Sequence, residues 1–189
     1  MNKGQSLSRS EQMSRIRAKD TSPELCLRSA LWKAGLRYRV HAKTPFGKPD
    51  VVFPHSRVAV FIDGCFWHGC PQHYVRPRSH IEHWEGKLLE NVKRDRQQTL
   101  ELEALGWNVI RVWEHEVYET AGDILSRIQL ALRGHAAPAT QDWRVVRVEE
   151  IEKSAGLERR HLEDLRDPGA IRSVEGRRIT AKWRRPRGG

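Results

Sequence analysis

The sequence is short of cysteine and of long apolar runs, and each shortage excludes a class of protein. Three cysteines among 189 residues are too few for a disulfide framework. No run of 18 apolar residues is present, which argues against a membrane-spanning helix, and the first ten residues lack the apolar segment of a signal peptide. We therefore expect a soluble protein of the cytoplasm with no membrane partner.

Acidic residues are also scarce relative to basic ones. The chain has 34 Lys and Arg against 24 Asp and Glu, a formal net charge of +10 at pH 7. An excess of this size favours a polyanionic partner such as a nucleic acid. Apolar residues make up 38% of the chain, enough for the core of one domain, so the composition excludes disorder throughout.

The hydrophobic spacing predicts an α/β fold in which a mixed β-sheet is flanked by helices. A first helix is expected where Thr21 supplies a hydroxyl cap and Pro23 lies in the first turn, and Gly35 ends it. Residues 57–63 are apolar on both faces, which is typical of a central strand. The other expected strands are residues 36–41, 50–53 and 107–113, and the other expected helices are residues 81–105 and about 124–132.

Composition divides the chain into three parts. Residues 1–20 are basic and poor in apolar side chains, and we expect a flexible arm that binds DNA. Residues 21–134 contain the α/β pattern. Residues 135–189 form an extension of unknown role that we expect to be partly disordered, with a strand at 143–148 and a helix at 149–165.

Two carboxylates mark the ends of neighbouring predicted strands. Asp50 begins one strand and Asp63 ends the next, so in a hairpin both can face one point. Two acids that converge at the end of a central sheet suit Mg²⁺, which can activate water and stabilise charge on a phosphate. Both residues also fit ordinary turns, so this alternative stays open for the pair alone.

Two further acids favour the catalytic interpretation. Glu24 lies in the first turn of the first helix, where it also suits the helix dipole. Asp95 falls on the inward-facing stripe of the long helix, where a carboxylate is costly without a partner. A salt bridge at the rim of the core remains an alternative for Asp95.

A cluster of cysteine and histidine follows the central strand. Cys65, Cys70 and His73 offer three ligands in an irregular segment, and His115 after the last strand is the best candidate for a fourth. Four such ligands predict a structural Zn²⁺ that stabilises the loop, whereas buried thiols and exposed histidines are the alternative. His68 lies between the ligands and is left over for chemistry.

The string from Phe61 to His68, FIDGCFWH, together with the upstream Pro49-Asp50, resembles the very short patch repair (Vsr) endonucleases. These bacterial enzymes nick DNA beside a T:G mismatch. The resemblance covers roughly residues 8–133 and implies a restriction-endonuclease-like fold, an Mg²⁺-dependent nicking reaction and a structural zinc site. It also implies a duplex with a T:G mismatch as substrate, general mismatch repair proteins as partners, and action on the bacterial nucleoid.

The resemblance assigns roles by position. It implies Mg²⁺ ligation by Asp50 and by the backbone carbonyl of Ile62, and catalysis by His68 with Asp95 in support. The remaining implied residues are Glu24 for catalysis, Cys65, Cys70, His73 and His115 for zinc, Phe66, Trp67 and Trp84 as a wedge beside the mismatch, and Met13 and Ile16 on the arm.

This chain also departs from the best-known members of the family. Where those have Thr-His, it has Ile62-Asp63, so Asp63 becomes a candidate Mg²⁺ ligand or a change in substrate. The extension after Arg133 has no counterpart in the resemblance. The alternative function is therefore a related endonuclease with a substrate that contains no mismatch. A third alternative, a zinc-containing duplex-binding protein without activity, leaves the acids unexplained, because acids repel phosphates.

Overall fold

The computed structural model describes residues 19–136, 146–154, 157–164 and 167–177. The chain divides into two compact units. The first unit comprises the chain up to Asp63 together with residues 98–141, and the second comprises residues 64–97 together with the chain from Asp142. In the described part of the chain, no helix has the length and apolar character needed to cross a bilayer.

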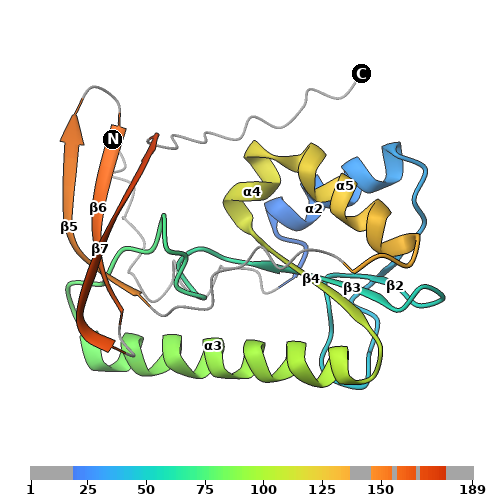
Figure 1. Cartoon of the computed structure of the whole chain (residues 1–189), viewed down its shortest axis with the longest axis horizontal. Helices are drawn as coiled ribbons and strands as arrows, with labels where there is room; N and C mark the ends of the chain where they lie inside the picture. Colours follow the sequence, from blue (N-terminus) through green and yellow to red (C-terminus); the bar gives the residue numbers. More distant parts are fainter. Residues whose placement is uncertain (1–18, 137–145, 155–156, 165–166, 178–189) are drawn as a thin grey trace, which may run out of the picture. The chain divides into compact units, whose positions relative to one another are not determined.

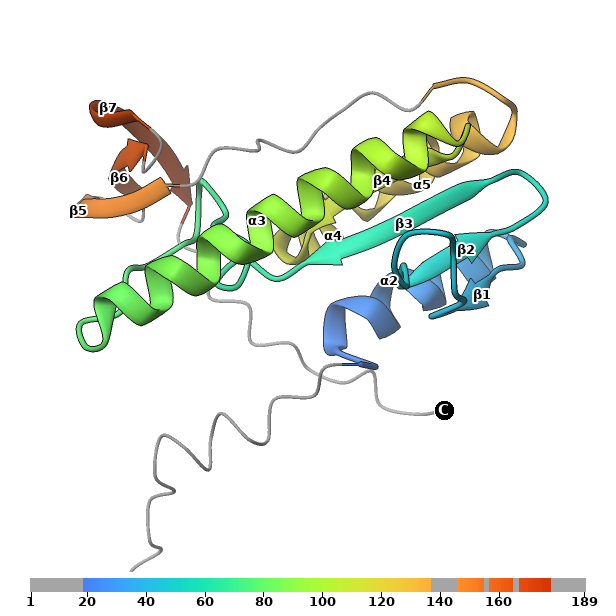
Figure 2. The same cartoon turned by 90° about the horizontal axis from the view of Figure 1, so that it is seen from below.

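The first unit contains a four-stranded sheet in the order β1-β2-β3-β4. Its strands are β1 (Arg39–Val40), β2 (Val51–Phe53), β3 (Val58–Asp63) and β4 (Asn108–Trp113). The first two pairings are antiparallel, while β3 and β4 run parallel, so the sheet is mixed as expected. Figure 2 shows β3 between β2 and β4, which confirms its central position.

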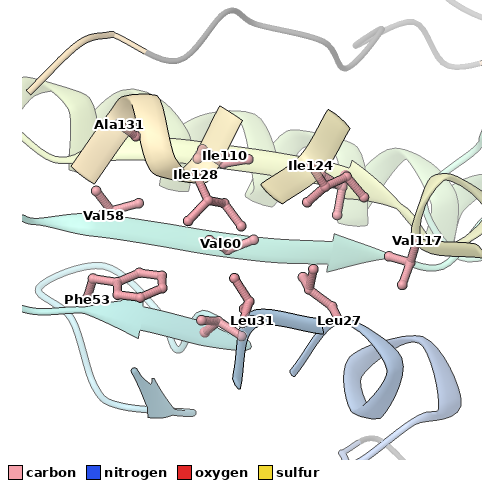
Figure 3. Close-up of a cluster of buried hydrophobic side chains, with 12 residues drawn as sticks. Leu27, Leu31, Phe53, Val58, Val60, Ile110, Val117, Ile124, Ile128 and Ala131 are labelled. Atoms are coloured by element: carbon pink, nitrogen blue, oxygen red, sulfur yellow. The ribbon is translucent and has the colours of Figure 1, made fainter. Parts of the chain in front are cut away.

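Three helices of the first unit cover one face of this sheet (Figure 1): α2 (Ser22–Lys33), α4 (Glu114–Glu119) and α5 (Ala121–Leu132). The helix α2 begins at the expected place, with Thr21 as N-cap and a capping box that Glu24 completes. The helix α4 was not expected from the sequence. Figure 3 shows the core between sheet and helices, which contains Leu27, Leu31, Val51, Phe53, Val58, Val60, Ile110, Val112, Val117, Ile124, Ile128 and Ala131.

The opposite face of the sheet has a smaller apolar cluster and also carries buried charged groups. Ala59 and Phe61 of β3 pack there against Leu102, which lies near the end of α3 (Ile81–Ala104). Because successive side chains of a strand point to opposite faces, Asp63 shares this second face with Phe61. The sheet thus has one apolar face and one face on which charged side chains are buried.

The second unit begins with an irregular segment, residues 64–80, that leads into α3. Tyr74 and Leu88 form its small core. Gly69 has φ +70°, and a Cβ there would lie 3.0 Å from Leu88 Cδ1. A glycine at this position therefore lets the segment approach α3 closely.

The rest of the described chain is a three-stranded antiparallel sheet, and this corrects one prediction. Its strands are β5 (Val146–Ser154), β6 (Leu157–Asp164) and β7 (Asp167–Arg177), so the helix predicted at residues 149–165 is wrong. Ser154, the last residue of β5, pairs with Leu157, the first residue of β6. Gly156 was the overlooked signal, because glycine disfavours a helix interior. Residues 143–145 of the predicted strand lie outside the described residues.

Candidate active site and metal ligands

Asp50 is held at the edge of β2 by hydrogen bonds to β3. Its backbone N–H donates to the carbonyl of Val60 at 3.0 Å, and its Oδ2 accepts the backbone N–H of Ile62 at 2.8 Å. These bonds follow from the antiparallel register of β2 and β3. The carboxylate is therefore fixed beside the backbone of Ile62, the residue whose carbonyl the resemblance assigns to Mg²⁺.

The pKa of the Asp50 carboxyl is raised from its ordinary value of 3.8 to about 6, and burial is the largest cause. The N–H of Ile62 and the charge of Arg28 oppose this increase, while the negative charges of Glu24 and Asp63 contribute to it. A buried carboxylate with neighbouring negative charge is short of positive charge. This environment suits a bound cation, so the donor set fits a divalent metal ion.

Glu24 is buried and engaged by several donors. Its Oε1 accepts the hydroxyl of Thr21 at 2.9 Å, and its Oε2 accepts the guanidinium of Arg28 at 2.6 Å. Arg28 also binds Asp20 at 2.6 Å and lies 3.0 Å from Nε2 of His41. Glu24 thus has a structural role in capping α2, and its catalytic role stays a prediction.

Asp63 has a different environment from Asp50. Its Oδ2 accepts Nε–H of Arg111 at 2.8 Å and its Oδ1 accepts Nη2–H of Arg111 at 2.5 Å. Both side chains are 4% exposed. Arg111 was not predicted from the sequence, and neither were Arg28 and His41. A charged residue inside the apolar strand at residues 107–113 was the available signal for Arg111.

The second unit contains a histidine–carboxylate pair. Nδ1 of His68 lies 2.5 Å from Oδ2 of Asp95, which is buried as its position on the stripe of α3 predicted. Oδ1 of Asp95 accepts two hydrogen bonds from Arg94, at 3.3 and 3.1 Å. With Asp95 as acceptor, the proton of the neutral imidazole is on Nδ1, so Nε2 is the nitrogen that can take a proton from water. This geometry matches a general acid/base and its orienting acid.

Three of the four predicted zinc ligands lie together in the second unit. Nδ1 of His73 is 3.6 Å from Sγ of Cys70 and 3.9 Å from Sγ of Cys65. Sulfur and nitrogen ligands on one tetrahedral Zn²⁺ are separated by about 3.6 Å. Both thiols are buried, and the group could hold a metal ion. His115, the fourth predicted ligand, is buried in α4 and belongs to the first unit.

Aromatic side chains form a cluster beside this segment. The ring of Phe66 lies 5.1 Å from Trp67 and 5.4 Å from Trp84, and the two tryptophan rings are 5.7 Å apart. A pocket is lined by these three rings together with Tyr74, Lys87, Leu88 and Asn91. All three rings are half-buried, so each keeps some exposed surface. Met13 and Ile16, the predicted contacts on the arm, lie outside the described residues.

Comparison with known proteins decides the family. The family model of the DNA mismatch endonuclease Vsr matches residues 1–73. The type II nicking enzyme V.NaeI of Lentzea aerocolonigenes is 48% identical over 118 residues, which are 60% of this chain and 71% of that enzyme. This chain belongs to the Vsr endonuclease family. The DNA mismatch endonuclease Vsr of Escherichia coli K12 is 39% identical to this Vsr-family chain over 107 residues, 56% of this chain and 69% of that protein.

Another relative agrees with this assignment. The type II nicking enzyme V.NmeDIP of Neisseria meningitidis serogroup C is 39% identical over 119 residues, 62% of this chain and 80% of that enzyme. Among solved structures, the catalytic domain of the homing endonuclease I-Bth0305I has a TM-score of 0.44 and 16% identity, and covers 61% of this chain and 98% of that domain. This Vsr-family chain is a DNA endonuclease, a hydrolase that acts on phosphodiester bonds.

Proposed function

We propose that this endonuclease nicks one strand of duplex DNA next to a T:G mismatch, in an Mg²⁺-dependent reaction that begins very short patch repair. The observation that carries the chemistry is the His68–Asp95 pair, at 2.5 Å, which joins the last residue of the string that resembles the Vsr family to α3. Mismatch specificity rests on membership of the Vsr family and on the aromatic cluster. General mismatch repair proteins are the proposed partners that process the nick.

Asp50 and the carbonyl of Ile62 would hold Mg²⁺. The raised pKa of Asp50 and its place beside the Ile62 backbone support this assignment. The ion would supply positive charge at the scissile phosphate and lower the pKa of bound water. The backbone of Ile62 and the side chain of Asp50 are joined by a hydrogen bond of 2.8 Å, so the chain holds both proposed ligands side by side.

His68 moves the proton in this proposal. Nδ1 donates to Asp95, which holds the ring and stabilises the imidazolium once Nε2 has taken a proton from the attacking water. Arg94 binds the other oxygen of Asp95 and holds that carboxylate in place. Asp95 is therefore proposed as the orienting acid. Glu24 is proposed as an additional catalytic acid on the resemblance alone.

A structural Zn²⁺ is proposed on Cys65, Cys70 and His73, with His115 as fourth ligand from the resemblance. The sulfur–nitrogen separations of 3.6 and 3.9 Å support the three ligands of the second unit. The segment 64–80 has little regular structure, so zinc would contribute directly to its folding. His68 and Trp67 lie inside this segment, so the metal would fix both.

The aromatic cluster is proposed as the mismatch wedge. Phe66, Trp67 and Trp84 are half-buried and in mutual contact, so a ring inserted between base pairs would be supported from behind. A mispaired step unstacks at a lower cost than a paired one, which gives preference for the mismatch without reading base edges alone. Met13 and Ile16 are proposed to contact the opposite groove.

A second candidate function is a nicking enzyme with a substrate that contains no mismatch. The departure Ile62-Asp63 and the arginine pair of Asp63 favour it, because they change the end of β3 relative to the family pattern. Several relatives are also named type II nicking enzymes.

Strand-resolved cleavage mapping tests the proposal. T:G and T:A duplexes of one sequence, labelled on either strand, are incubated with Mg²⁺ or with EDTA, and a panel of flanking sequences is included. The proposal predicts one cut beside the mismatched T, only with Mg²⁺. Equal cutting of the T:A duplex would favour the second candidate function, and cutting in EDTA would contradict the metal assignment.

A further inference from the structure

Asp63 and Arg111 form a pair that neither the fold nor the proposed reaction explains. Two hydrogen bonds, at 2.8 and 2.5 Å, join them in a fork geometry, and both side chains are almost fully buried. Removal of two charges from water is costly, so such a pair adds little net stability compared with an apolar pair. The free-energy cost of burying this pair therefore indicates a role beyond packing.

The pair lies next to Ile62, the residue whose carbonyl is expected to ligate the metal. In the parallel register Arg111 is opposite Phe61, and its guanidinium carbon lies 4.6 Å from the centroid of that ring. Its guanidinium nitrogens then reach Asp63, two residues further along β3. Arg111 thus contacts the residue on each side of Ile62, whose N–H binds Asp50.

Arg111 is itself anchored on two sides. Nη1 of Arg111 donates to Oε1 of Gln98 at 3.5 Å, and the carbonyl of Arg111 accepts Nη2–H of Arg127 at 3.3 Å. Gln98 belongs to α3 and Arg127 to α5. A guanidinium with this many contacts is held in one orientation, which is required of a group that positions another.

Asp63 and Asp50, the two acids at this edge of the sheet, differ in the groups that neighbour their carboxylates. The carboxylate of Asp63 forms an ion pair with the guanidinium of Arg111 at 2.5 Å. A cation bound to the same oxygens would be repelled by that guanidinium. Asp50 has no guanidinium fork of this kind: its Oδ2 accepts the backbone N–H of Ile62, and its Oδ1 lies 3.9 Å from Nδ1 of His41.

We propose that Arg111 is a positioning residue of this nuclease: it binds Asp63 as a neutral pair, so that Asp63 holds the Ile62 peptide in place instead of ligating the metal. The inference rests on the proposed use of Asp50 and Ile62 as metal ligands. It replaces the role of Asp63 as a direct ligand with a supporting one, and it leaves Asp50 as the carboxylate of the site.

The test compares Arg111→Gln, Asp63→Asn and the double variant Asp63→Asn/Arg111→Gln in the full-length protein. The readouts are the Mg²⁺ affinity by calorimetry, the Mg²⁺ concentration for half-maximal nicking, and the melting temperature. Partners that orient metal ligands typically change metal affinity by about 10- to 100-fold. Arg111→Gln is therefore expected to weaken Mg²⁺ binding about tenfold, because Asp63 is released from the fork.

The double variant decides between the two roles of Asp63. An Asn–Gln pair keeps a neutral hydrogen-bonded bridge between β3 and β4, so we expect Mg²⁺ affinity within about threefold of wild type, that is, within about 0.7 kcal/mol. A loss of Mg²⁺ binding in Asp63→Asn and in the double variant alike would show Asp63 to be a ligand and overturn the proposal.

Two further measurements keep the result readable. If Arg111→Gln does not fold, Arg111→Lys keeps the charge without the fork and is expected to show the same weaker Mg²⁺ affinity; wild-type affinity in a folded Arg111 variant overturns the proposal. Mg²⁺ binding is measured without DNA, so a chain that fails to nick T:G duplexes contradicts the proposed function while the role of Arg111 is still tested.

Discussion

The two units hold their functional side chains in different ways. In the first unit, Asp50 and Asp63 are placed by the register of β2, β3 and β4, and their contacts are to the sheet backbone and to Arg111. In the second unit, His68 and the cysteines lie in a segment with little regular structure. Their places there depend on side-chain contacts, such as those of His68 with Asp95 and of the thiols with His73.

The two units also differ in how much their folding is expected to depend on a metal. The first unit has a large apolar core between its sheet and helices, whereas the described core of the second is Tyr74 and Leu88 with a few half-buried neighbours. A core this small does not stabilise an irregular segment of this length on its own. We expect zinc to supply the difference.

The largest expected effect comes from loss of the zinc, which should unfold the second unit and leave the first folded. Cys70→Ser should reduce bound zinc from about one per chain to none and abolish nicking, because structural zinc contributes roughly 10 kcal/mol or more to a small site. Metal analysis of protein purified without chelator and amide exchange measure this. Cys26→Ser is the matched control, because Cys26 lies in α2 of the first unit. A well-folded, active wild-type protein without zinc would contradict the prediction.

The accuracy of the predictions from sequence also differs between the two units. The strands and helices of the first unit were predicted to within about two residues at most ends, because burial imposes regular periods on β3, β4 and α5. The strand expected at residues 36–41 is reduced to Arg39–Val40, at the exposed edge of the sheet. The helix α4 has only six residues, too few for a periodic signal.

The candidate site was predicted in part. The inward position of Asp95 and the grouping of Cys65, Cys70 and His73 follow from spacing, and the structure agrees. The partner of Asp63 could not be predicted, because Arg111 is 48 residues away and meets it only through a parallel register. Residues 149–165, which belong to β5 and β6, were mistaken for a helix because their apolar residues fit neither period well.

The next effect concerns the first unit. Asp50→Ala should lower the nicking rate by about 10⁴-fold, since a catalytic metal stabilises the transition state by several kcal/mol, and should leave DNA binding intact. Single-turnover nicking and a filter-binding assay separate the two quantities. Asp123→Ala, an exposed acid of α5, should have little effect. Unchanged turnover in Asp50→Ala would refute the mechanism.

The corresponding change in the second unit should be smaller. His68→Ala removes a general acid/base, which is worth about 10²- to 10⁴-fold, so we expect a loss of about 10³-fold. Asp95→Asn keeps the ring contact but not the charge, and should lose less. His55→Ala, at an exposed turn, is the matched control. If His68→Ala cut as fast as His55→Ala, the imidazole would have no part in proton transfer.

The raised pKa of Asp50, a residue of the first unit, predicts that the free energy of unfolding depends on pH. In the metal-free protein the folded state holds this proton more tightly than the unfolded state, since the pKa is raised from 3.8 to about 6. The protonated carboxyl of Asp50 therefore adds to the free energy of unfolding below pH 3.8. This contribution, at most about 3 kcal/mol, is lost as the pH rises to 6. Urea denaturation in EDTA should show this slope in wild type and not in Asp50→Asn. Parallel curves for the two proteins would contradict it.

The smallest effect, on the second unit, tests the central claim that the aromatic cluster reads a T:G mismatch. The measurement is the ratio of single-turnover nicking rates on T:G and T:A duplexes, with binding measured alongside, for wild type, Trp67→Ala and the control Trp32→Ala, whose ring is 59% exposed on α2. Base stacking on an aromatic ring is worth about 1–3 kcal/mol, so Trp67→Ala should reduce the wild-type preference for T:G by about tenfold and non-specific affinity by less. A wild-type enzyme that cuts both duplexes equally, or a preference unchanged in Trp67→Ala, would contradict the account.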